Sequence, residues 1–151
     1  MRLATSAAIC LFAALPVIAT AQSAEDALEA RHGYMKMLAI NMGKLSAMAK
    51  GDMAYDEAAA STAAANIVAL TQYDVPSLFI EGTAEGEAEG SEALPAIWEN
   101  PDDFATKFTE LADAAAGSPE AVMGGQDNIG PALQKLGGAC KACHDDYRKK
   151  D

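Results

Sequence analysis

The sequence predicts an all-α fold, an antiparallel four-helix bundle. After residue 22, apolar side chains recur at intervals of three and four residues, and no run alternates with a period of two for long enough to form a strand. Four such segments are separated by stretches that contain glycine and proline, which end helices. The apolar stripes repeat about every 3.5 residues, which is typical of helices packed in a left-handed bundle.

The first predicted helix extends from Ser23 to about Lys50, where Gly51 is expected to end it. Its inner face is predicted to consist of Leu28, Arg31, Met35, Leu38, Met42, Leu45 and Ala49. Arg31 is unusual because leucine would be expected at an inner position of this helix.

The second predicted helix begins at the N-cap Asp56 and ends near Gln72, before Pro76. Its inner face is predicted to consist of Ala60, Ala63, Ile67 and Leu70. These mostly small side chains would leave a thin core with little apolar volume, so we expect another group to fill part of the bundle.

The connection between about Tyr73 and Asn100 is longer than a bundle turn requires, and long loops of this kind are usually functional. It contains an acidic, glycine-rich segment at 81–92, which we interpret as a solvated loop rather than a dedicated cation site. Phe79 and Trp98 flank this segment, and each is expected either to touch a bound group or to anchor the loop.

The third predicted helix has Asn100 as its N-cap and Pro101 in its first turn, and it is expected to end or kink at 117–120. Its inner face is predicted to consist of Phe104, Phe108, Leu111 and Ala115. The fourth predicted helix begins near Asp127 or Asn128. Its inner face is predicted to consist of Ile129, Leu133, Leu136, Cys140, Cys143 and Tyr147. Two cysteines therefore lie on the inner face of the last helix.

The N-terminal segment has the pattern of a secretory signal peptide, with a short apolar run and a small-residue cleavage site at 19–21. The run is short for a membrane span, so we predict that residues 1–21 are cleaved, that Cys10 leaves with them and that no membrane anchor remains. The predicted mature chain, residues 22–151, is one domain. It has 10 basic and 22 acidic residues, a net charge of −12, which argues against nucleic acid as a partner.

Cys140, Cys143 and His144 form the pattern Cys-x-x-Cys-His, which allows three chemistries. A reactive dithiol is usually placed at a helix N-terminus, whereas this pair lies near a predicted C-terminus with no strand before it. A zinc or copper site needs about four ligands, and the only other histidine, His32, is expected on the surface. The pattern favours haem, held by two thioether bonds with His144 on the iron. The predicted fold is then a four-helix bundle with one covalently bound haem, which would also fill the thin core.

Arg31 is a further candidate because a buried cation needs an anion, and a haem propionate is one. The alternative is that Arg31 reaches out to Asp26 or Glu29 at the surface. Met35, one helical turn further on, is either core filling or an iron ligand. Arg148, one turn beyond the histidine of the motif, either contacts a propionate or complements the helix dipole.

The chain resembles the cytochrome c′ family, the class II c-type cytochromes. The specific feature is the haem motif close to the C-terminus, within LQKLGGACKACHDDYRKK, which is similar to the family's haem helix. EARHGYMKM resembles its first-helix motif, LFIEGT its loop after the second helix, and AIW the start of its third helix. The resemblance covers the whole predicted mature chain.

The resemblance implies a role for each matching residue. Cys140 and Cys143 would form the thioethers of haem c, and His144 would be the proximal iron ligand. Arg31 would bind a propionate, and Arg148 would be the proximal basic residue.

The resemblance also implies further contacts with the haem. Ser91 and Glu92 match a short segment that contacts haem in relatives, and Phe79 is a further candidate contact. Met35 falls on the distal position that guards the sixth iron site. Some family members leave that site without a ligand and are high-spin, whereas low-spin relatives bind a methionine sulfur there.

The function implied by the resemblance is that of a periplasmic haem protein. It would transfer one electron, bind a small gas such as nitric oxide at a pentacoordinate iron, or do both. The alternatives are a low-spin, methionine-ligated electron carrier and, further, a secreted dithiol oxidoreductase. The sequence contains no recognisable catalytic constellation, so no enzyme activity is expected. Relatives form homodimers through their first two helices, and a periplasmic redox partner or gas ligand is expected.

Overall fold

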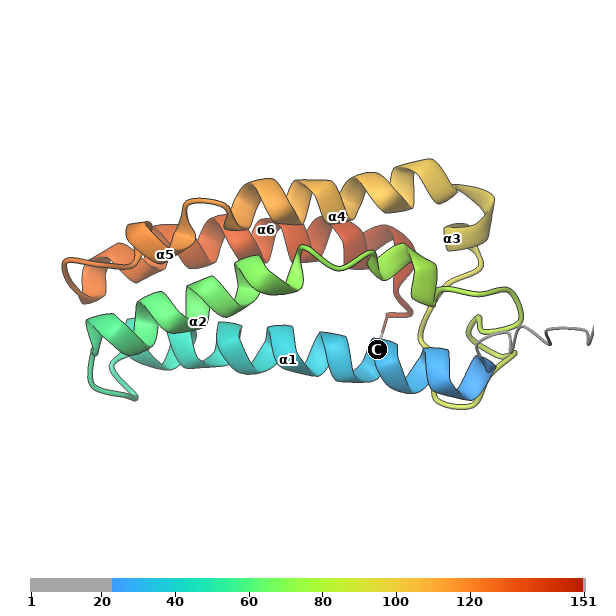
Figure 1. Ribbon diagram of the computed structural model, residues 1–151, viewed down its shortest axis with the longest axis horizontal. Helices are drawn as coiled ribbons and strands as arrows, with labels where there is room; N and C mark the ends of the chain where they lie inside the picture. Colours follow the sequence, from blue (N-terminus) through green and yellow to red (C-terminus); the bar gives the residue numbers. More distant parts are fainter. Residues whose placement is uncertain (1–22, 151) are drawn as a thin grey trace, which may run out of the picture.

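The computed structural model describes residues 23–150, so the predicted signal peptide at 1–21 lies outside the described residues. Within 23–150, four long helices lie side by side along the long axis of the molecule (Figure 1). They are α1 (Ala24–Lys50), α2 (Glu57–Leu70), α4 (Pro101–Ala115) and α6 (Ile129–Tyr147). The shorter elements are η1 (Val75–Leu78), α3 (Ala96–Glu99), α5 (Ser118–Ala121) and η2 (Gln126–Asn128). The predicted antiparallel four-helix bundle is confirmed.

The ends of the first two long helices are fixed by the capping residues that the sequence predicts. The Ser23 hydroxyl accepts a hydrogen bond from the backbone N–H of Asp26 at 3.0 Å. Gly51 ends α1 with a left-handed backbone at φ 78°, which glycine adopts without steric cost. The Asp56 carboxylate accepts a hydrogen bond from the backbone N–H of Ala59 at 2.8 Å and caps α2. Each cap satisfies a helix-end polar group and is typically worth about 1 kcal/mol.

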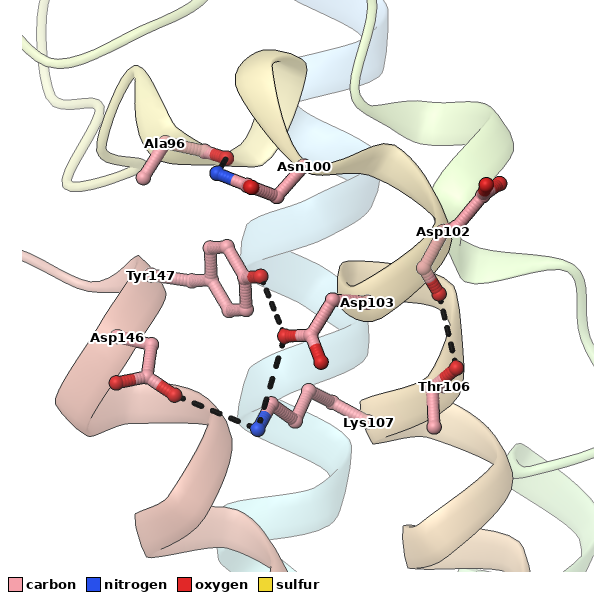
Figure 2. Close-up of polar contacts among 8 residues, drawn as sticks. All are labelled: Ala96, Asn100, Asp102, Asp103, Thr106, Lys107, Asp146 and Tyr147. Atoms are coloured by element: carbon pink, nitrogen blue, oxygen red, sulfur yellow. Dashed lines mark hydrogen bonds and ion pairs between the residues drawn. The ribbon is translucent and has the colours of Figure 1, made fainter.

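The predicted capping role of Asn100 is wrong in one respect. Asn100 occupies the N-cap position of α4, but its side chain makes no capping hydrogen bond to that helix. Its Nδ2 instead donates to the carbonyl oxygen of Ala96 at 3.2 Å (Figure 2). The short helix α3 ends immediately before α4, and the hydrogen bond to Ala96 ties the Asn100 side chain to α3 instead.

The inner face of α1 is shifted from the predicted stripe. Its buried residues are Ala27, Arg31, Tyr34, Leu38, Asn41, Leu45 and Met48. Leu28, Met35 and Met42 lie next to this stripe and are only half-buried. The helix therefore has two adjacent inward faces, one packed on α2 and α6 and one facing a cavity.

A loop and the C-terminal residues close one end of the bundle (Figure 1). The acidic segment 81–92 lies here, and the prediction that it is a solvated loop holds only in part, because Thr83, Ala84 and Ser91 are buried. The segment is also tied to the C-terminus. The Nζ of Lys149 donates to the Glu85 carboxylate at 2.7 Å, and Ala93 forms an isolated antiparallel bridge with Arg148. No helix within residues 23–150 has the length and apolar character needed to cross a membrane.

Candidate haem-binding site

A cavity of about 390 Å³ lies between α1, α4 and α6, at the end of the bundle that the loop closes. Its volume falls within the range of about 300–1,000 Å³ that is typical of pockets for small molecules and cofactors. All nine residues predicted as haem or iron contacts line it, namely Arg31, Met35, Phe79, Ser91, Glu92, Cys140, Cys143, His144 and Arg148. The fold thus brings together residues from α1, the long loop and the end of α6.

Cys140 and Cys143 are half-buried on α6, and both face the cavity. Desolvation by burial raises the pKa of Cys140 and raises the pKa of Cys143 to about 11. At pH 7 only about one Cys143 thiol in ten thousand would be the reactive thiolate. This environment disfavours the dithiol oxidoreductase interpretation.

His144 follows Cys143 directly and lines the same cavity. Its pKa is lowered by desolvation first and by the positive charge of Arg148 second. A lowered pKa keeps the imidazole neutral at neutral pH, and the neutral imidazole is the form that binds iron. Within residues 23–150, no group of three histidine, cysteine or acidic side chains is arranged to hold a metal ion by itself.

Arg31 is buried, with 3% of its surface exposed, although it carries a positive charge. Its Nη2 donates to the carbonyl oxygen of Thr83 at 3.2 Å, and its guanidinium carbon lies 4.6 Å from the centroid of the Phe79 ring. Desolvation by burial lowers the pKa of Arg31. The alternative that this side chain reaches a surface carboxylate is wrong, because the guanidinium points into the protein.

The remaining donors of Arg31 fit an anionic cofactor. Among the described residues, its Nε and Nη1 are buried and have no hydrogen-bond partner. Leaving a buried charged donor unpaired costs several kcal/mol, so such groups are normally paired in the functional protein. A carboxylate at the Arg31 end of the cavity would pair with both donors, and haem carries two propionates. The residues present therefore fit haem.

Ser91 and Glu92 help to hold the loop over the cavity. The Ser91 hydroxyl donates to the carbonyl oxygen of Thr83 at 2.7 Å, the same oxygen that accepts from Arg31. The Nε of Arg148 donates to the Glu92 carboxylate at 2.8 Å. The loop is thus fastened to α1 through Thr83 and to the end of α6 through Glu92.

Phe79 and Trp98 have different roles, which the sequence left open. Phe79 lines the cavity, whereas the indole N–H of Trp98 donates to the carbonyl oxygen of Phe79 at 3.1 Å. Trp98 therefore anchors the residue that faces the cavity. Met35 lines the cavity from α1 and is half-buried.

His32 and Lys107 were not selected as site residues from the sequence, and both line the cavity. His32 is exposed, as expected, but it also contributes to the cavity wall. Lys107 lies between Phe104 and Phe108 on the inner stripe of α4, and it follows Asp103 by one turn. A cation on an apolar stripe, one turn from a carboxylate, is the signal that could have identified it.

A four-helix bundle with a cofactor cavity beside a C-terminal Cys-x-x-Cys-His motif defines a class of c-type haem proteins. The family model for Cytochrome C′ matches residues 26–148, and the chain belongs to this family. The protein therefore carries one covalent haem c, as the family does.

Curated relatives match over most of their length. Cytochrome c′ of Cereibacter sphaeroides is 44% identical over 93% of this chain and 94% of its own. Cytochrome c-554 of the same organism is 46% identical over 91% of each chain. Two differently named cytochromes thus stand at nearly the same identity to this chain.

Solved structures of the family have the same fold. Cytochrome c′ from Rhodobacter Spheriodes is 42% identical, covers 86% of this chain and 100% of its own, and has a TM-score of 0.81. A cytochrome c′ named for a ligand-controlled dimer dissociation is 27% identical over 87% of this chain and 100% of its own, with a TM-score of 0.76. A nitric oxide complex of a cytochrome c prime variant from Alcaligenes xylosoxidans is 31% identical over 84% of this chain and 97% of its own, with a TM-score of 0.69.

Proposed function

We propose that this protein transfers one electron, binds a small gas such as nitric oxide at a pentacoordinate haem iron, or does both, in the periplasm. The observation that carries the proposal is that all nine predicted site residues line one cavity of about 390 Å³. The solved nitric oxide complex of a family member supports the choice of gas. The secretory pattern of residues 1–21 supports the periplasm, because covalent haem attachment takes place outside the cytoplasm.

The residues of the site have distinct roles in this proposal. Cys140 and Cys143 form the thioethers, and the neutral imidazole of His144 is the axial ligand. Arg31 pairs with a propionate through the two buried donors that the protein itself leaves unpaired. When bound, haem supplies the Fe(III)/Fe(II) couple, whose potential depends on burial and on nearby charges.

Part of the cavity wall is apolar. Leu28, Met35 and Met42 line the cavity from α1, and Phe108 lines it from α4. We propose that these apolar side chains limit the access of water. The pentacoordinate reading requires that the Met35 sulfur guards the sixth position without binding iron. The low-spin, methionine-ligated carrier is the alternative.

Replacing Met35 by alanine tests whether the iron is pentacoordinate or bound by the Met35 sulfur. We expect the reduced wild-type protein to change its absorption spectrum on addition of carbon monoxide or nitric oxide. In Met35→Ala the spectrum before gas is added should stay high-spin. Gas association should be faster by roughly tenfold, which corresponds to about 1.4 kcal/mol of steric barrier. Stopped-flow absorption spectroscopy measures both quantities.

Met42→Ala is the matched control for this test, because Met42 also lines the cavity from α1 but lies about two turns further along the helix. It should leave the gas association rate close to the wild-type value. The pentacoordinate interpretation would be contradicted if the wild-type spectrum is low-spin, does not change with either gas, and becomes high-spin only in Met35→Ala. That result would establish the methionine-ligated carrier.

We also propose that the protein forms a homodimer through α1 and α2. Met37 and Ile40 of α1 are 47% and 57% exposed, which is unusual for large apolar side chains. The outer face of α2 is made of small side chains, which permit close approach of a second copy, namely Ala58, Thr62, Ala65 and Ala69. The relative named for its dimer dissociation supports this assembly.

Ile40→Asp should weaken the homodimer by at least about 30-fold, because a charge at the centre of an apolar interface typically costs about 2 kcal/mol or more. Sedimentation equilibrium of the haem-loaded protein measures this change. Met123→Asp provides the control, since Met123 is 42% exposed but lies outside α1 and α2. Equal dissociation in both variants would show that the dimer does not use α1.

A further inference from the structure

A polar cluster connects α4 to the end of α6 beside the haem cavity. We call it the Lys107 cluster, and it consists of Asp103, Lys107, Asp146 and Tyr147 (Figure 2). The Nζ of Lys107 lies 3.3 Å from the Asp146 carboxylate and 3.7 Å from that of Asp103. The Tyr147 hydroxyl donates to the Asp103 carboxylate at 2.6 Å. Two residues of each helix thus share one network.

Lys107 is the least exposed charged member of the cluster. Its side chain is 16% exposed, whereas the side chains of Asp103 and Asp146 are 57% and 58% exposed. The hydrogen bond to Asp146 is the largest of the effects that raise the pKa of Lys107. The ammonium group therefore stays charged at neutral pH, and it is held where solvent screens it less than its two partners.

Lys107 lies beside the haem-attachment region. Lys107, Cys143 and His144 line the same cavity. Asp146 and Tyr147 follow the proposed iron ligand by two and three residues. The cluster therefore holds both a fixed cation and the last turn of α6 beside the proposed attachment site.

We propose that the positive charge of Lys107 raises the reduction potential of the haem. Asp103 and Asp146 hold the ammonium group of Lys107 at the cavity wall. The inference rests on the proposed attachment of haem at Cys143. Reduction lowers the charge on the iron by one, so a nearby cation stabilises the reduced state and a nearby anion destabilises it. On reduction the protein takes up one electron from a soluble mediator. The Lys107 cluster keeps its protons and its charge during this step.

The experiment is a mediated redox titration of the haem-loaded protein and four variants. Lys107→Met, which keeps the length and removes the charge, should lower the midpoint potential. Lys107→Arg should keep it near the wild-type value. Asp146→Asn, which leaves Lys107 less compensated, should raise it. The control Lys135→Met should leave it unchanged, because Lys135 is exposed on α6 and lies outside both the cavity and the motif.

Opposite shifts in Lys107→Met and Asp146→Asn distinguish a charge effect from loss of a structural contact, since both variants break the same ion pair. Shifts of the same sign, or a Lys107→Met potential equal to that of the control, would overturn the inference. If Lys107→Met does not fold, Asp146→Asn alone still has to raise the potential, and an unchanged or lower value overturns the inference. Wild-type protein whose haem is removed by acid and organic solvent would instead overturn the proposed attachment itself, and with it this inference.

Discussion

Replacing both Cys140 and Cys143 by alanine is expected to abolish covalent haem attachment. The two thiols face the same cavity from one side of α6, and each is proposed to form one thioether bond. Without them, haem would be held only by the His144 ligand and by non-covalent contacts. Extraction with acid and organic solvent should then remove all of the haem from the double variant and none from the wild-type protein.

Cys10→Ala is the control for this experiment, because residue 10 belongs to the segment predicted to be cleaved. Its haem should resist extraction as the wild-type haem does. Pigment that remains bound to the double variant after extraction would show that attachment uses another residue.

Replacing Arg31 by methionine is expected to destabilise the haem-loaded protein by about 3 kcal/mol, because removing one partner of a buried ion pair leaves the other charge uncompensated. The substitution also removes the contacts of the guanidinium with Thr83 and with the Phe79 ring. Chemical denaturation followed by the haem absorption band measures the change. Lys36→Met, at an exposed position of the same helix, should change the unfolding free energy by less than about 0.5 kcal/mol.

The sign of the Arg31→Met effect discriminates between two states of the site. If an anion pairs with the two buried donors, the substitution destabilises the protein. If no anion is there, the substitution removes an unpaired buried cation and the protein becomes more stable. A more stable Arg31→Met variant would therefore contradict the assignment of a propionate to Arg31.

The helices could be predicted from the sequence because their determinants are local. Ser23, Gly51 and Asp56 act within a few residues of themselves, and each fixes the helix end that it predicts. The prediction for Asn100 was less accurate, because α3 ends beside it and its side-chain amide donates to the carbonyl of Ala96 in that helix. A single residue cannot reveal which of two neighbouring helices will use its side chain.

The inner face of α1 shows the limit of periodicity. Arg31, Leu38 and Leu45 are buried as predicted, whereas Met35 and Met42 face the cavity and are half-buried. A period near 3.5 residues selects an inward side, but it does not separate the stripe that packs on helices from the stripe that faces a cofactor. That division depends on where the other helices lie.

The contacts that complete the site are long-range and could not be predicted. Arg31 donates to the carbonyl oxygen of Thr83, which is 52 positions away in the sequence. Tyr147 donates to Asp103, which is 44 positions away. Such pairs depend on the register between helices and on the path of the long loop. The motif residues themselves were easier to identify, because Cys140, Cys143 and His144 are adjacent on one helix.

We propose that haem is bound covalently in the cavity through the motif on α6. Mass spectrometry of a protease digest of the protein, made in a cytochrome-maturing host, tests it most directly. We predict that the peptide spanning Cys140 to His144 carries the mass of one haem and has no free thiol. The same peptide at its unmodified mass, with two free thiols or a disulfide, would contradict the claim.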